Sequence, residues 1–136
     1  MPISRGLRDA ANLLNGSTML GVLAGLLTRA RFRFRGGLLV ADRARVPKAV
    51  TASAITVGSV VLVPRQSLED AVARIPALME HEDQHAWQYA YCLGLPFLPL
   101  YLAATAWSLA RTRDRAHANF FEVQAGLETG GYRRPY

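Results

Sequence analysis

The sequence predicts an α+β fold in which a small antiparallel sheet packs against helices. Residues 31–35 alternate Arg and Phe with a period of two, and residues 54–63 are rich in Val and Ile, so both segments are predicted strands. Residues 3–29 and 76–130 instead contain apolar stretches with helix start and stop signals. The predicted strands therefore stand together between two helical regions.

We expect one domain spanning residues 1–136, because a chain of this length fits a domain of ordinary size with a modest core. Its expected parts are an N-terminal helical segment, a small sheet, a group of helices around a metal site, and a tail. Their ranges are 1–30, 31–63, 67–130 and 131–136.

The N-terminal segment is predicted to be a pair of helices broken near Asn15 and Gly16. Residues 10–28 carry no charge, and an uncharged stretch of this length raises the question of a membrane span. Four polar side chains and three glycines interrupt it, so we favour a core helix pair over a membrane anchor.

A β-hairpin is predicted next, with Gly36 and Gly37 in the turn because glycine adopts positive φ without penalty. The alternation in its first strand places Phe32 and Phe34 on the inner face and the arginines on the outer face. Residues 41–53 are predicted to be a mobile loop.

Residues 54–63 are predicted to form the strongest strand, with Gly58 as a bulge and Pro64 at its end. If the strand lies at an edge, residues Val57, Gly58 and Ser59 could receive an extended peptide by strand addition. The alternative is a central strand of the sheet.

The stretch at residues 81–85 is the most informative motif, because it reads His-Glu-x-x-His. On a helix, His81 and His85 lie one turn apart on the same face, where two imidazoles can bind one metal ion. Glu82 follows the first histidine and can act as general base on a metal-activated water. Neutral imidazole suits zinc, so the motif predicts one Zn²⁺ per chain.

A zinc site of this kind needs a third protein ligand, which in one subgroup is a Glu on a later helix. Three carboxylates follow His85, namely Asp114, Glu122 and Glu128. We favour Glu122, since it stands at a predicted helix start with Asn119 as the N-cap. The same spacing would also make Glu122 a capping-box partner of Asn119.

The pattern H-E-x-x-H-x-x-Q, followed by an apolar helix and N-x-x-E-x-x-A, resembles the small bacterial gluzincin-type predicted metallopeptidases, sometimes called minigluzincins. The resemblance extends back through residues 55–63, which look like the family's strand beside the metal helix. Family members often have Pro after the Asn, where this chain has Phe120. The matching residues are His81, Glu82, His85, Gln88, Asn119, Glu122 and Ala125.

The motif and the resemblance together predict zinc-dependent hydrolysis of a peptide or protein substrate. Glu82 would activate the water and then carry its proton to the leaving amine. His117, Tyr132 and Tyr89 are candidates for stabilising the transition-state oxyanion, and the sequence does not choose among them. The resemblance implies a zincin-like metal helix followed by a helix that carries the Glu ligand.

Two other readings of the motif remain open. Glu82-x-x-His85 is also half of the motif of di-iron helical bundles, but the second half would need a Glu three residues before His117, where Asp114 stands. The non-enzymatic alternative is a metal-stabilised scaffold or a basic interaction module in contact with a membrane surface.

The chain is basic, with 16 Lys and Arg against 10 Asp and Glu. Nucleic acid is disfavoured as a partner, because Phe32 and Phe34 are expected to point away from the neighbouring arginines. Residues 92–110 are uncharged but contain two prolines, and a single pass there would separate the histidines from Glu122. The one cysteine excludes an internal disulfide. We expect a cytoplasmic protein, with peripheral membrane association left open and the oligomeric state undetermined.

Overall fold

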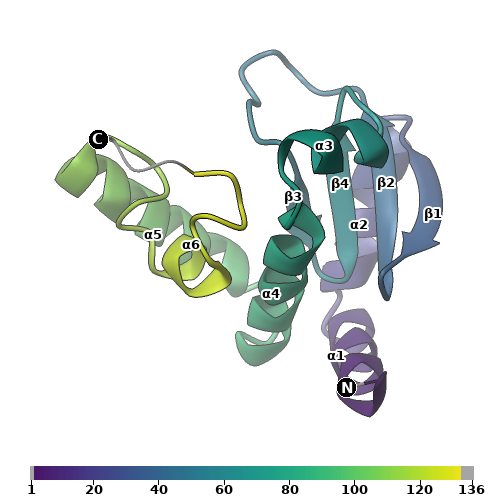
Figure 1. Cartoon of the computed structure of the whole chain (residues 1–136). Coiled ribbons are helices and arrows are strands. Elements are labelled where there is room, and N and C mark those ends of the chain that lie inside the picture. The colour runs from purple at the N-terminus through teal and green to yellow at the C-terminus, as the bar shows by residue number, and fades with distance from the viewer. Residues whose placement is uncertain (1, 133–136) are drawn as a thin grey trace.

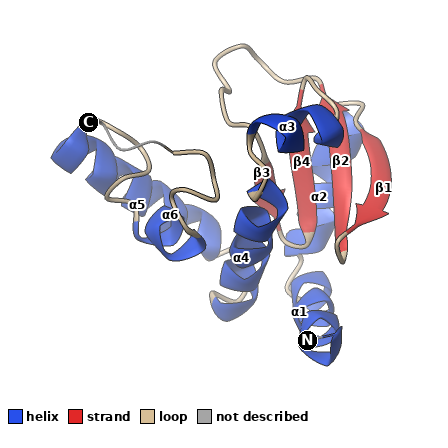
Figure 2. Ribbon diagram, viewed as in Figure 1, coloured by secondary structure: helices blue, strands red, loops and turns tan. Residues whose placement is uncertain are grey.

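The computed structural model describes residues 2–132, and within them the chain forms an α+β fold with a mixed four-stranded sheet and six helices (Figure 1). Figure 2 shows α3 in front of the sheet, α2 behind it, and α5 and α6 beside α4. In chain order the elements are α1 (Pro2–Leu14), α2 (Ser17–Leu27), β1 (Arg31–Arg35), β2 (Leu38–Ala44), β3 (Ile55–Val57), β4 (Val60–Pro64), α3 (Leu68–Arg74), α4 (Leu78–Tyr91), α5 (Phe97–Thr112) and α6 (Phe120–Ala125).

The sheet has the order β1-β2-β4-β3. The prediction of an antiparallel sheet is wrong for one pair, because β2 and β4 run parallel. The pairs β1/β2 and β3/β4 are antiparallel. The segment 45–54 leads from the end of β2 to the far edge of the sheet, where β3 forms. The chain then returns as β4 between β2 and β3, which makes β4 central and leaves β3 at the edge.

The prediction of one strand over residues 54–63 is wrong, because Gly58 and Ser59 form a turn between β3 and β4. Gly58 has a φ of +65°, and a Cβ there would collide with the backbone at Thr18 in the first turn of α2. The turn and the close approach both require glycine. Gly58 and Ser59 are buried and lie in this turn, so Val57 alone of the three predicted edge residues belongs to the edge strand.

The inward placement of the phenylalanines is confirmed for Phe32 and wrong for Phe34. Phe32 packs beneath α2, where a Cβ on Gly25 would collide with its ring. The helix does not reach Phe34, which is 83% exposed. The predicted loop at residues 41–53 begins later than expected, since β2 continues to Ala44.

The helix predictions hold in outline and fail mainly at one end. Ser67 caps α3 by accepting a hydrogen bond from the Asp70 N–H. The predicted break near Gly16 separates α1 from α2. The last helix ends at Ala125, before the predicted helical region ends at residue 130, because Gly126 adopts a φ of +104°. The chain then turns back over α4, which matters for the metal site.

The core lies on both faces of the sheet. Side chains of β2 and β4 pack under α3 and α4 on one face, and others from the same strands pack under α2 and toward Tyr89, Phe97 and Phe121 on the other. Over the residues described, no single helix is long and apolar enough to cross a bilayer, although residues 5–14 and 17–27, bent by 76°, pass that test as a pair.

Candidate metal centre

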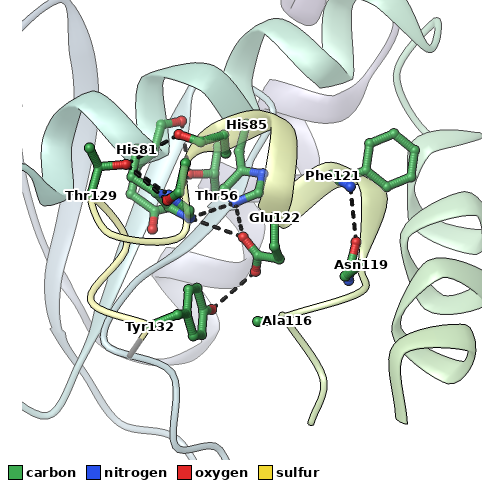
Figure 3. A network of polar contacts seen from close by, with 12 residues as sticks. Thr56, His81, His85, Ala116, Asn119, Phe121, Glu122, Thr129 and Tyr132 are labelled. Carbon is green, nitrogen blue, oxygen red and sulfur yellow. Dashed lines mark hydrogen bonds and ion pairs between the residues drawn. The ribbon is translucent and has the colours of Figure 1, made fainter. Parts of the chain in front are cut away.

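The two histidines of the motif face the carboxylate of Glu122 across the gap between α4 and α6 (Figure 3). The Oε1 atom of Glu122 lies 3.0 Å from Nε2 of His81 and 2.7 Å from Nε2 of His85. The two Nε2 atoms lie 3.0 Å apart. All three side chains are buried, so the structure brings together the three residues predicted as ligands.

The tautomers of both imidazoles follow from their second hydrogen bonds. Nδ1 of His81 lies 2.8 Å from the carbonyl oxygen of Gly126, which can only accept, so Nδ1 carries the proton. Nδ1 of His85 lies 2.8 Å from Oε1 of Gln88. The amide of Gln88 is oriented by its Nε2, which donates to the carbonyl of Phe121 at 2.8 Å. Each imidazole, when its one proton is on Nδ1, therefore presents an Nε2 lone pair to the same point.

This donor set fits a zinc ion. The two Nε2 atoms and Oε1 of Glu122 each direct a lone pair to the same point. Their mutual repulsion must be offset by a cation there, which is either a proton or a metal ion. Tetrahedral zinc with ligands at about 2.0–2.1 Å separates neighbouring ligand atoms by about 3.3 Å. The observed 2.7–3.0 Å separations would need to open by only a few tenths of an ångström.

The second oxygen of Glu122 is held by two tyrosines. Tyr101 donates to Oε2 at 2.6 Å, and Tyr132 donates to the same atom at 3.0 Å. Burial, followed by the negative charge of Glu122, raises the pKa of both phenols above the ordinary range, so they stay protonated. Asn119 caps α6 by accepting from the Phe121 N–H at 3.0 Å, as predicted. These contacts leave Oε1 free to face the histidines.

The electrostatics of the cluster favour a shared cation. Burial alone would lower the pKa of His85, but its hydrogen bond to Glu122 and the charges of Glu82 and Glu122 raise that pKa to about 9. Burial would raise the pKa of Glu122, but its close contacts with the imidazoles of His81 and His85 outweigh burial and lower that pKa below its usual range. Without metal, a proton on His85 Nε2 bridges to a charged Glu122.

Glu82, the predicted general base, is buried beside the ligands without belonging to the metal-binding group. Its Oε2 accepts a hydrogen bond of 2.6 Å from the hydroxyl of Thr56 on β3. Glu82 and the candidate metal ligands His85 and Glu122 line one cavity of about 380 Å³. Thr56, Tyr101 and Tyr132 also line it, and the other walls are mainly apolar side chains from residues 49–57 and 97–98.

Of the three candidate oxyanion stabilisers, two line the cavity and one does not. Tyr132 lines the cavity and contacts Glu122, and Tyr89 lines the cavity while packing against Phe97. His117 lies elsewhere: its Nδ1 is 2.8 Å from Asp114, its Nε2 is buried without a partner, and it does not line the cavity. Of the predicted edge residues, Val57 lines the cavity, whereas Gly58 and Ser59 do not.

Several residues at the centre have no counterpart in the sequence prediction. Tyr101 comes from an uncharged helix in which it resembles any core aromatic, and Thr56 from a strand in which it resembles any β-branched residue. Gly130 covers the ring of His81 so closely that a Cβ there would lie 2.5 Å from the ring. Only long-range contacts give these residues a role, and no spacing rule signals them.

No protein-family model, curated protein or solved structure matches this chain.

We expect zinc affinity to rise with pH, because the proton held by His85 must leave when metal binds. The pKa of His85 is about 9, so between pH 6.5 and 8.5 the affinity should rise about tenfold per pH unit. Above about pH 9 the gain from this group ends. Competition titration against a chromophoric chelator at four pH values measures this. A flat affinity over the same interval would contradict the assignment of that proton.

Proposed function

We propose that this protein is a zinc-dependent metallopeptidase of the gluzincin type that its sequence resembles. The observation that carries the proposal is the convergence of His81, His85 and Glu122, because His85 and Glu122 line the same cavity as Glu82. A helix with H-E-x-x-H followed by a helix with a Glu ligand supports a zincin-like arrangement. One Zn²⁺ per chain is the cofactor that this donor set favours.

Each residue has a role that follows from its contacts. Zinc, when bound, would acidify a water molecule and polarise the peptide carbonyl. Glu82 takes a proton from that water and delivers it to the leaving amine, and Thr56 holds the carboxylate of Glu82 by its hydroxyl. Tyr132 and Tyr101 are protonated donors on the cavity wall, so either could turn from Glu122 to a developing oxyanion.

A peptide is the substrate that suits this cavity. The edge strand β3 forms one of its walls, through Ile55, Thr56 and Val57. An edge strand has unpaired backbone groups on its outer side, and an extended peptide can pair with them by strand addition. The apolar wall around Tyr89, Phe97 and Leu98 would receive an apolar side chain of the peptide.

A metal-stabilised scaffold without turnover is the second candidate. The short helix α6 and the segment after it pack against α4 through contacts at His81 and His85. Zinc would tie these parts together, and its binding energy would then contribute to folding.

Metal content and cleavage, measured in parallel, test both candidates. Purified protein should contain one zinc per chain by elemental analysis, and a peptide library should be cleaved by the zinc-loaded form. His81→Ala with His85→Ala should remove both properties. Stoichiometric zinc in that double variant would refute the site, whereas zinc-loaded wild type that cleaves no library peptide would favour the scaffold.

A further inference from the structure

The helix α2 presents its larger apolar side chains to solvent and its smallest residues to the sheet. Ser17, Gly21 and Gly25 are its buried residues. The opposite face is exposed and has no charged side chain; it consists of Met19, Leu20, Leu23, Leu26 and Leu27. On a core helix of a soluble domain the apolar stripe faces inward, so this orientation is inverted.

Close packing explains why the small face is turned inward. A Cβ on Gly21 would lie 2.5 Å from the carbonyl oxygen of Val57, and a Cβ on Gly25 would collide with the ring of Phe32. The helix therefore lies against the sheet with no room for larger side chains. Because the small residues face the sheet, the leucines of α2 face outward, and within residues 2–132 they remain exposed to solvent.

A second helix shows the same property. In α5 the buried side is formed by Phe97 and Ser108, while Leu100, Leu102 and Trp107 are exposed. No charged residue occurs in this helix before Arg111. In Figure 1, α5 extends away from the sheet, and among the elements in residues 2–132 it meets mainly α6.

The two apolar faces meet at the starts of their helices. A Cβ on Gly94, just before α5, would collide with the side chain of Asn15, just before α2. The side chains beside this contact are apolar and open to solvent, with Leu14 at 88% and Leu93 at 77% exposure. Exposed apolar side chains therefore occur on α2, at this junction and on α5, and we call them together the leucine surface. Exposed apolar surface of this kind marks an interaction site.

Arginines lie at the far ends of both helices. Arg29 and Arg31 follow α2 and are exposed, and Arg111 lies 5.0 Å above the ring of Trp107 at the end of α5. The chain has a net charge of +6. Apolar side chains flanked by cations and an exposed Trp match a bilayer interface, where acyl chains meet anionic headgroups.

We propose that the leucine surface docks this protein onto an anionic lipid bilayer as a peripheral membrane protein. The leucines of α2 and α5 enter the headgroup and acyl boundary, while the arginines at the helix ends meet the phosphates. A second copy of the chain fits less well, because two such surfaces would bring their arginine ends together without acidic partners.

Co-sedimentation with lipid vesicles tests the proposal with the full-length protein. Vesicles of phosphatidylglycerol and phosphatidylcholine in equal amounts should bind it at least about tenfold more tightly than pure phosphatidylcholine vesicles. Leu23→Glu with Leu26→Glu should weaken binding at least about tenfold, and so should Leu100→Glu with Trp107→Glu. Phe34→Glu is the matched control, since it changes an exposed apolar residue on β1 and should leave binding unchanged.

Folding and self-association are measured on the same samples. Unchanged circular dichroism and zinc content in the Leu→Glu variants would show that lost binding reflects the surface rather than the fold. Absence of sedimentation with any vesicle, or anionic binding that the Leu→Glu changes leave intact, would overturn the proposal. A dimer in solution that these changes dissociate would overturn it too, in favour of a second copy as the occupant.

Discussion

Glu82→Gln should leave one zinc bound per chain and reduce peptide hydrolysis by about 100- to 10,000-fold, which is the usual loss on removing a general base. The amide keeps the size of the side chain, and its oxygen can still accept the hydrogen bond from Thr56 that Glu82 accepts at 2.6 Å. The proposed metal ligands His81, His85 and Glu122 are unchanged in this variant. The change therefore removes the proton acceptor while preserving the cavity.

The measurement is the initial rate of cleavage of the best library peptide, with zinc content determined on the same preparation. Glu80→Gln is the control, because it makes the same chemical change on an exposed position of the same helix. Its rate should equal that of wild type. Undiminished cleavage by zinc-loaded Glu82→Gln would refute the mechanism, and loss of zinc from that variant would show that Glu82 is itself a ligand.

The candidate metal-binding group is the most predictable part of the molecule. Helical spacing alone places His81 and His85 on one face, and α4 carries both. Glu122 can be predicted as the third ligand because Asn119 marks a helix start, and the Asn119 cap is present in the structure. Local chemistry determined these features, so local reasoning sufficed.

The errors lie where a local pattern has two solutions. A Val-rich run containing Gly58 is consistent with a bulged strand or with a hairpin, and contact with the start of α2 decides for the hairpin. The parallel pairing of β2 with β4 then follows from that extra turn. The alternation places Phe32 and Phe34 on the same face of β1, and the position of α2 determines which of them is covered.

The surroundings of the metal centre could not be predicted for a related reason. The carbonyl of Gly126 sets the tautomer of His81 from 45 residues away, and Tyr101 reaches Glu122 across 21 residues. Neither residue type is unusual at its own position. Their roles come from the fold of α5, α6 and the segment after α6, which the sequence prediction described only as helices and a tail.

Glu122→Gln should weaken zinc binding by at least about 100-fold, exceeding the 10- to 100-fold typical of residues that only orient a ligand. The substitution removes the negative charge that faces both Nε2 atoms at 3.0 and 2.7 Å. The pKa of His85, which is about 9 in the parent protein, should fall, because its hydrogen bond to Glu122 and the charge of Glu122 both raise it. The stability that protonated His85 gives the metal-free parent protein is full below about pH 6.5 and is lost as the pH rises through about 9, so in the variant it should be smaller and should be lost at a lower pH.

Chelator competition measures the zinc affinity of this variant, and NMR titration of the histidine ring protons measures the pKa. Glu128→Gln is the matched control, because Glu128 is exposed, lies on the segment just after α6 and does not belong to the candidate metal-binding group. It should bind zinc as wild type does. The amide of Glu122→Gln can donate to the hydroxyls of Tyr101 and Tyr132, which accept as well as donate, so the fold should persist. Wild-type zinc affinity in Glu122→Gln, or a His85 pKa that stays near 9, would remove Glu122 from the metal site and with it the proposed ligand set.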